Sequence, residues 1–306
     1  MVKTSAVQEE KRKRPFKQWF KHLLQTYPFL KLLLNHMDAW GTAFIISMVV
    51  LLVHDAATPR TALLLVAYSA GYWLAFTLND YYDVSVDALD PRKRERNYFV
   101  QHPKRNKLAW GIIGLLLLGG FVYIFGQFGF VGLGLLAVCL FVMWAYSAPP
   151  LRLKNRPIID VLTHALFVQT FPYVMGLLLI RAEWTLLDGF IIAVLFFASL
   201  TAQIEQQVRD FEADSQLERT FATMLGRDRT NILLKVTTAV MMLIAIIGLI
   251  IRIFPPFIIT FGALGLPAFL HRFLRQQQVP RSEWLVLGSI SLAVVYTTAV
   301  FIYSLL

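Results

Sequence analysis

Residues 61–87 read TALLLVAYSAGYWLAFTLNDYYDVSVD, and this stretch combines the two features that recur along the chain. Its first twenty residues are almost entirely apolar, and an α-helix needs about 20 apolar residues to cross the hydrocarbon core of a bilayer. An acidic segment follows at once. We therefore expect a membrane-spanning helix over 61–80 with a cluster of carboxylates at one end.

Eight further apolar runs flank this one, and Leu, Ile, Val and Phe follow one another in them without polar alternation. Continuous runs indicate helices in lipid, whereas the strands of an outer-membrane barrel would alternate. Composition agrees, because 57% of the residues are hydrophobic, 16% are charged and mean hydropathy is +0.58. We predict an all-α integral membrane protein. Its nine spans would be 38–54, 61–80, 108–126, 130–147, 159–181, 186–204, 232–252, 254–270 and 285–306.

Lys and Arg are distributed unevenly between alternate connections of this arrangement. Of the 29 cations, 26 fall in the N-terminal segment and after the second, fourth, sixth and eighth spans, whereas the other connections hold Arg60, Arg181 and Arg252. Cytoplasmic loops carry such an excess, so we expect a cytoplasmic N-terminus and a C-terminus outside. Topology and anionic lipid explain most of the net charge of +10. Because the cations are spread over membrane loops, we do not expect nucleic-acid binding.

The chain divides into a cytoplasmic N-terminal segment, 1–37, and a nine-helix transmembrane domain, 38–306. Residues 11–34 mix cations with Phe, Trp and Leu, a composition typical of a helix lying on the membrane surface. Acidic loops follow the second and the sixth span, and an even offset of four spans puts both on one side. We therefore expect a parallel four-helix repeat with the ninth span left over.

The acidic loops share a spacing that indicates metal binding. Asn79, Asp83 and Asp87 are each four residues apart, as are Asp210 and Asp214, so on a helix each set would share a face. Carboxylates at this spacing repel unless a cation neutralises them, and Mg²⁺ takes one or two carboxylates while keeping positions for water and phosphate. One such pair is usually a solvated turn. Two such sets on one side of the membrane predict two Mg²⁺ ions that bind one diphosphate. Asp83, Asp87, Asp210 and Asp214 would then be catalytic.

Cations near these motifs are candidate diphosphate contacts, because guanidinium and ammonium groups suit phosphate oxygens. Arg152 and Lys154 follow a Tyr-Ser-x-x-Pro turn that starts at Tyr146 and Ser147. The segment after the first acidic motif adds Arg94 and Arg96, whereas topology alone accounts better for Arg92, Arg105 and Arg156.

Three motifs, NDYYDVSVD at 79–87, YSAPPLRLK at 146–154 and RDFEAD at 209–214, resemble those of the UbiA superfamily of intramembrane prenyltransferases. The resemblance implies nine helices enclosing a central cavity, with a cytoplasmic cap over two Mg²⁺ ions. One ion would be bound by Asn79, Asp83 and Asp87, and the other by Asp210 and Asp214. The diphosphate would then contact Tyr146, Ser147, Arg152 and Lys154.

Two departures from the family pattern bear on the acceptor. Many members have an Arg-Pro pair after the first motif, where this chain has Arg96-Asn97, and many have Asp where this chain has Gln207. The DPRKR stretch at 90–94 looks more like the branch that elongates carotenoids. It is also similar to the branch that transfers phosphoribose to a polyprenyl phosphate, which is a poorer match at YSAPPLRLK.

Together with the metal and diphosphate contacts predicted from the residues, the resemblance implies Mg²⁺-dependent transfer of an isoprenyl group from an allylic prenyl diphosphate to a hydrophobic acceptor. The many groups placed to stabilise a leaving diphosphate, and the lack of an apparent nucleophile set, indicate a carbocation-like step. A carotenoid alkene, a quinone precursor or another lipid would be the acceptor. Tyr68, Tyr72, Trp73 and Phe76 could face the prenyl tail or pack between helices. His164, near Thr163 and Gln169, could deprotonate an acceptor or form a structural hydrogen bond.

Two other functions stay open. One is phosphoribosyl transfer to a polyprenyl phosphate. A transporter would place ionisable groups near the midplane, whereas here the acids cluster at one membrane face.

Overall fold

The computed structural model describes residues 27–103, 107–217, 219–274 and 282–306, and within these ranges every regular element is helical. Each of the nine apolar runs forms a helix or a helical rod. The first four long helices are α3 (Met37–Val53), α4 (Pro59–Tyr82), α8 (Lys107–Gly126) and α9 (Gly129–Ser147). A rod follows, formed by α10 (Pro157–Ala165), η2 (Leu166–Thr170) and α11 (Phe171–Ile180). The last four are α12 (Leu186–Leu217), α14 (Arg227–Ile250), α15 (Pro256–Leu274) and α16 (Glu283–Leu305).

Seven of these helices are long and apolar enough to cross a membrane within the described ranges, and Met37–Val53 and Pro256–His271 are shorter apolar helices. The all-helical membrane fold is therefore confirmed, while the count of nine crossings and the four-helix repeat stay predictions. Leu115 and Leu116 on α8 are each 70% exposed and Phe130 on α9 is 95% exposed. Lipid is the solvent that such outward apolar faces require.

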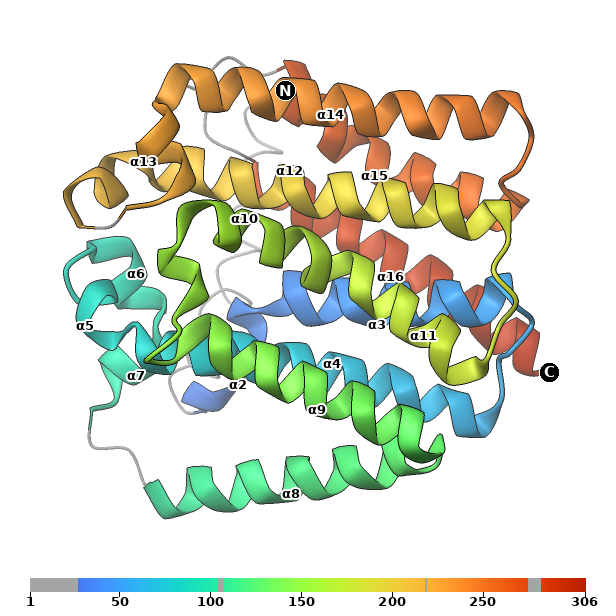
Figure 1. Cartoon of the computed structure of the whole chain (residues 1–306), viewed down its shortest axis with the longest axis horizontal. Helices are drawn as coiled ribbons and strands as arrows, with labels where there is room; N and C mark the ends of the chain where they lie inside the picture. The colour runs from blue at the N-terminus through green and yellow to red at the C-terminus, as the bar shows by residue number, and fades with distance from the viewer. Residues whose placement is uncertain (1–26, 104–106, 218, 275–281) are drawn as a thin grey trace, which may run out of the picture.

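Short helices gather at one end of the bundle. They are α5 (Val84–Asp87), α6 (Pro91–Arg96), α7 (Tyr98–Gln101) and α13 (Phe221–Leu225), and Figure 1 shows all four at the end opposite the C-terminus. The turn η1 (Leu153–Asn155) and the helix α2 (Pro28–Asn35) complete the short elements. Of the surface helix expected over 11–34, α2 lies in the described part, and residues 11–26 lie outside it.

The core is built around α3, whose buried face packs against α11, α12 and α16. Tyr173 and Leu177 of α11 lie in this core with no exposed surface. At Gly176 an added Cβ would lie 2.5 Å from a methyl group of Val50, so only glycine lets α11 approach α3 this closely. A second core joins α4 to α8, α9 and α11.

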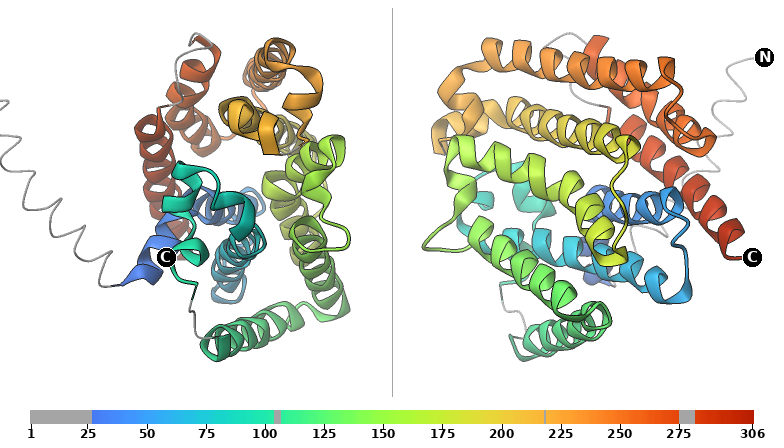
Figure 2. Two further views of the ribbon diagram at one scale, coloured as in Figure 1. Left: turned by 90° about the vertical axis from the view of Figure 1, so that its left-hand side faces the viewer. Right: turned by 45° about the vertical axis from the view of Figure 1, so that its right-hand side comes forward.

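In the end view of Figure 2 (left) the long helices are arranged as a ring. Side chains of the described residues enclose a central cavity. Its volume is about 1420 Å³, larger than the roughly 300–1,000 Å³ of most small-molecule sites. Side chains from α3, α12, α14, α15 and α16 line its apolar part. The cavity reaches the end of the bundle that carries α5 and α6, where its lining becomes charged.

Two acidic segments expected as loops are largely helical. The helix α12 has 32 residues and a length of about 48 Å, so it runs well beyond a hydrocarbon core of about 30 Å and carries Asp210 and Asp214 with it. At the other segment, α4 ends at Tyr82 and α5 begins at Val84. The break at Asp83 leaves the four-residue spacing in place, because the N–H of Asp83 donates to the carbonyl of Asn79 and the N–H of Asp87 donates to the carbonyl of Asp83.

Candidate active site at the mouth of the cavity

The mouth of the cavity is lined by oxygen ligands from two elements far apart in sequence. The segment α4–α5 contributes Asn79, Asp83 and Asp87, and α12 contributes Asp210 and Asp214. All five predicted metal ligands therefore line one cavity. Both α12 carboxylates are largely buried, at 8% and 7% exposure.

Asp83 is contacted by two cations from the turn that follows α9. The Nη2 of Arg152 lies 3.1 Å from Oδ1 of Asp83, and Nζ of Lys154 contacts the same oxygen. Lys154 also donates to Oδ1 of Asn79 at 2.9 Å, and the Ser147 hydroxyl donates to that oxygen at 3.4 Å. Arg152 adopts a left-handed conformation with φ of 38°, uncommon for a residue with a side chain, and this sharp turn brings both cations back to α4.

The α12 carboxylates are also paired with cations. The Nε of Arg209 lies 3.2 Å from Oδ1 of Asp210, and Nζ of Lys93 lies 3.6 Å from Oδ1 of Asp214. Lys93 belongs to α6, so this ion pair joins the segment after the first acidic motif to the second motif. The two carboxylate sets thus face one charged mouth.

Asn97 fixes the position of Asp87. Its Nδ2 donates to Oδ2 of Asp87 at 2.7 Å and to the carbonyl of Asp80 at 2.8 Å, while its Oδ1 caps α7 by accepting from the N–H of Phe99. Burial raises the pKa of the Asp87 carboxyl to about 6, and the Asn97 hydrogen bond limits that rise. Asn97 follows Arg96 at the position where many family members have proline. It therefore orients a predicted metal ligand, Asp87.

Of the remaining residues predicted to contact the diphosphate, only some lie at the mouth of the cavity. Tyr146 and Arg96 line the cavity. The Nη2 of Arg96 donates to the carbonyl of Asn35 at 3.4 Å, so its guanidinium is directed to α2. Arg94 is exposed and is not among the cavity-lining residues. The structure therefore brings Arg96, but not Arg94, to the rim.

The sequence analysis missed Asp160, a buried carboxylate in the first turn of α10. Its Oδ1 accepts from the Tyr146 hydroxyl at 2.6 Å, and its Oδ2 accepts from the amides of Gln203 at 2.9 Å and Gln207 at 2.6 Å. Gln207 also accepts from the N–H of Ala222 at 3.0 Å. The network ties α9, α10, α12 and α13 together below the mouth. Its signal in the sequence was an Asp inside an apolar run.

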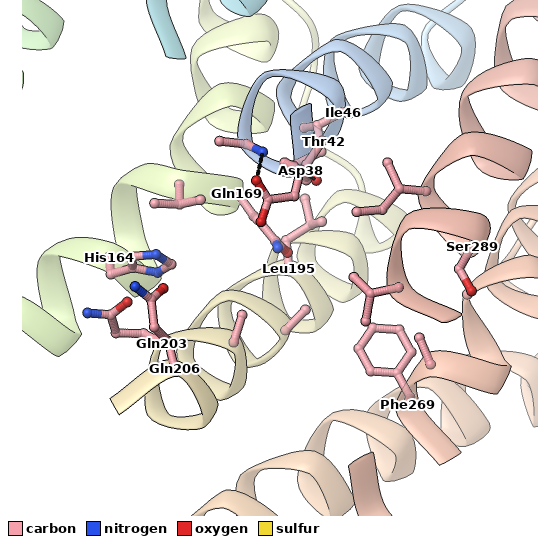
Figure 3. Close-up of a pocket in the computed structure, with 18 of the residues that line it drawn as sticks. Asp38, Thr42, Ile46, His164, Gln169, Leu195, Gln203, Gln206, Phe269 and Ser289 are labelled. Carbon is pink, nitrogen blue, oxygen red and sulfur yellow. Dashed lines mark hydrogen bonds between the residues drawn. The ribbon is translucent and has the colours of Figure 1, made fainter. Parts of the chain in front are cut away.

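The cavity changes from polar to apolar with depth. Figure 3 shows His164, Gln203 and Gln206 gathered on one side, with Gln169 nearby and Phe269 across the cavity. Phe254 and Phe261 add further aromatic surface around α15. A polar middle zone therefore separates the charged mouth from an apolar chamber.

The aromatic residues expected on α4 mostly pack between helices. Phe76 lines the cavity, but Tyr68 is buried and stacks on Phe125, and the Tyr72 hydroxyl contacts the carbonyl of Phe167. Trp73 is buried as well. None of these three lines the cavity, so they do not face a prenyl tail there. Tyr68 and Tyr72 pack instead against residues of α8, α9 and η2.

No group of three or more His, Cys, Asp or Glu residues in the described ranges is close enough to hold a metal ion by itself. The mouth nevertheless fits Mg²⁺, which takes one or two carboxylates and completes its octahedron with water and phosphate. Carboxylate and amide oxygens of the required kind come from both α4–α5 and α12. A diphosphate between them would supply the missing ligands.

The sequence profile described as the UbiA prenyltransferase family matches residues 39–293. The chain is 28% identical over 159 residues to the lycopene elongase/hydratase of Corynebacterium glutamicum, over 49% of this chain and 53% of that protein. It thus spans about half the length of the curated relative it matches.

Two solved structures share the fold. One is a UbiA homolog from Archaeoglobus fulgidus bound to GPP and Mg²⁺, with 23% identity and a TM-score of 0.65 over 89% of this chain and 99% of that one. The other is a UbiA homolog from the same organism bound to DMAPP and Mg²⁺, with 22% identity and a TM-score of 0.64 over 89% and 98%.

Proposed function

Because the chain belongs to the UbiA prenyltransferase family, we propose that it transfers an isoprenyl group from an allylic prenyl diphosphate to a hydrophobic acceptor and releases diphosphate. The observation that carries the proposal is the cavity itself. Both carboxylate sets and Lys154 line one charged mouth, and Arg152 forms an ion pair with Asp83 there. A large apolar chamber lies below this mouth. Such a shape suits an amphiphile whose head is a diphosphate and whose tail is a hydrocarbon.

The mouth residues have separate tasks in this reaction. Asp83, Asp87 and Asn79 would hold one Mg²⁺, and Asp210 and Asp214 a second. Divalent metal there supplies positive charge that stabilises the leaving diphosphate. Arg152 and Lys154, which contact Asp83 now, would turn to the phosphate oxygens as the diphosphate enters. The solved structures of UbiA homologs bound to GPP or DMAPP with Mg²⁺ support the use of a prenyl diphosphate together with Mg²⁺.

The chamber would carry the tail of the donor and the acceptor. Its lining of Met, Leu, Ile and Phe excludes water from an allylic cation, which would otherwise be hydrolysed. An electron-rich alkene can capture such a cation with its own electron pair. The partial match to a lycopene elongase/hydratase favours a carotenoid alkene as the acceptor.

We place the mouth at the cytoplasmic face. Of the 29 Lys and Arg residues, 26 fall in the N-terminal segment and after the second, fourth, sixth and eighth spans. In the described part of the chain, the short helices α5, α6 and α13 that follow the second and sixth spans lie at the end of the bundle that carries the mouth. The C-terminus would then lie outside. A topology reporter after Leu306 should report an outside location, and a label at residue 90 a cytoplasmic one.

The activity can be tested with purified protein in lipid vesicles. The vesicles receive Mg²⁺, lycopene and DMAPP or GPP, and the products are identified by mass spectrometry. We expect prenylated carotenoid and one diphosphate per product. Consumption of phosphoribosyl diphosphate with a polyprenyl phosphate, and no use of prenyl diphosphates, would instead identify a phosphoribosyl transferase.

A further inference from the structure

The polar middle zone of the cavity contains a histidine that could act as the base required by the proposed reaction. His164 of α10 lines the cavity, and Figure 3 shows it beside Gln203 and Gln206. Prenyl transfer to an alkene leaves a positive charge on the acceptor, and a proton must leave before a stable alkene forms. The mouth residues described above act on the diphosphate, and none of their roles removes that proton.

The contacts of His164 leave one ring nitrogen as a base. The Ser199 hydroxyl donates to the His164 carbonyl at 2.8 Å, so its single proton is committed. The same Ser199 oxygen lies 3.4 Å from Nδ1 of His164 and can only accept there. This arrangement favours the tautomer with a proton on Nδ1, and Nε2 then carries the free lone pair.

Two other ionisable residues that line the cavity, Asp160 and, nearer the end opposite the mouth, Tyr173, already use their oxygens in hydrogen bonds. Asp160 accepts three hydrogen bonds through its two oxygens. The hydroxyl of Tyr173 donates to Asp188 at 2.7 Å. Asp38 also lines the cavity, from the first turn of α3, and its Oδ1 accepts from the N–H of Ala39 at 3.0 Å. Among the groups gathered beside Gln203 and Gln206, His164 is the one with a ring lone pair that the contacts described above leave available.

The depth of His164 also fits this role. Ser199 precedes Asp210 by eleven residues on α12, which is about 16 Å of helix, so the backbone of His164 lies well below the metal-binding carboxylates. Side chains of a helix lean toward its N-terminus, and α10 starts at the mouth, so the ring leans back toward it. The reacting carbons of a donor held at the mouth would lie between the two levels.

The π-turn η2 supports the same zone. The N–H of Phe171 bonds to the carbonyl of Leu166, five residues earlier, and both His164 and Gln169 line the cavity although they are five residues apart. Regular α-helical spacing would turn residues five apart away from each other. Single π-turns of this kind occur frequently at functional sites.

We propose that Nε2 of His164 is the base that ends the reaction, an inference that rests on the proposed prenyl transfer to an alkene. The donor C–O bond breaks with its electron pair going to diphosphate, and the acceptor π pair forms the new C–C bond. The C–H bond next to the resulting cation then breaks. Its electrons form the new double bond and its proton goes to Nε2.

The test compares product formed with diphosphate released for His164→Gln and His164→Ala, which keep or remove the bulk of the side chain. Both variants should still release diphosphate, while prenylated alkene per diphosphate falls at least tenfold, because general bases contribute about 10²-fold or more. The cation that is not deprotonated should instead be captured by water or rearrange, and should be detected as alcohols or isomers. Ser199→Ala should give a smaller change in the same direction, since it only loosens the ring.

Thr163→Val is the matched control, because Thr163 neighbours His164 without lining the cavity. It should leave the ratio unchanged. An unchanged ratio in His164→Gln, or a parallel loss of product and diphosphate in both His164 variants, would overturn the role of His164. If the wild-type protein releases no diphosphate from any prenyl donor, the proposed function itself fails, and the inference fails with it.

Discussion

The two ends of the bundle both contain buried aspartates, but they neutralise them in different ways. At the closed end, Asp188 of α12 has no exposed surface and accepts from His54 at 2.9 Å, Tyr173 at 2.7 Å, and the N–H and hydroxyl of Thr185 at 2.7 Å each. At the mouth, Asp83, Asp210 and Asp214 are instead paired with Arg or Lys side chains.

The difference distinguishes a carboxylate held by packed neighbours from the carboxylates that we propose bind metal. The partners of Asp188 come from the end of α3, from within α11 and from the residue before α12, so the cluster fastens these three helices together. The four donors occupy both carboxylate oxygens. The cations at the mouth are long side chains that can move to a phosphate and leave the carboxylates to a metal ion. We expect substitutions at the closed end to cost stability and those at the mouth to cost activity.

The largest effect should come from Asp210→Asn at the mouth. The variant keeps the size of the side chain but loses an anionic ligand, so turnover should fall by at least about a thousandfold, or about 4 kcal/mol. Its melting temperature should stay within a few degrees of wild type, measured by thermal scanning fluorimetry in detergent. Turnover near the wild-type rate would contradict the assignment of Asp210.

The next effect is the loss of stability from Asp188→Asn at the closed end. The amide cannot accept from all of the present donors, and a buried group left unpaired costs about 3 kcal/mol. The melting temperature should fall clearly, while kcat per folded molecule stays within about threefold. A large loss of kcat in protein that remains folded would show that the closed end takes part in the reaction.

A smaller effect is expected for Lys154→Gln, which removes a charge but keeps hydrogen-bonding capacity. Charge-assisted hydrogen bonds contribute about 1.5–3 kcal/mol, so kcat/KM for the donor should fall by about 10- to 100-fold. The mass-spectrometric product assay at several donor concentrations gives this number. Arg94→Gln is the matched control, because Arg94 is exposed and does not line the cavity.

The smallest effect concerns pH. The Asp87 carboxyl has a pKa raised to about 6, so it is protonated and a poorer metal ligand as pH falls below 6. Activity at limiting Mg²⁺ should therefore decline on the acid side near pH 6. Asn97→Ala removes a hydrogen bond that lowers this pKa, so the decline should move to higher pH. An unmoved acid limb would show that another group controls it.

Much of the fold was predictable because a membrane span is a local property of the sequence. The continuous apolar runs predicted the long helices, and the Asp spacing placed the predicted metal ligands at one mouth. The resemblance of three motifs then led to the family, which the profile match confirms.

What the sequence did not predict depends on contacts between helices. Asp160 was overlooked because its partners Tyr146, Gln203 and Gln207 come from two other helices. Tyr68 and Tyr72 were candidates for the cavity wall because helical spacing shows which residues share a face of a helix. It does not show whether that face lines a cavity or packs against another helix. The π-turn η2 likewise changes which residues face the cavity without a composition signal that marks it.

The most direct measurement counts the divalent ions that the mouth holds together with a diphosphate. Mn²⁺ can replace Mg²⁺, and its binding to the purified protein can be followed by electron paramagnetic resonance with a non-reactive prenyl diphosphate analogue present. We expect two ions in the wild-type protein, and one each in Asp83→Asn/Asp87→Asn and Asp210→Asn/Asp214→Asn, with two retained in Asp188→Asn. Equal counts in the wild type and both mouth variants would contradict the account.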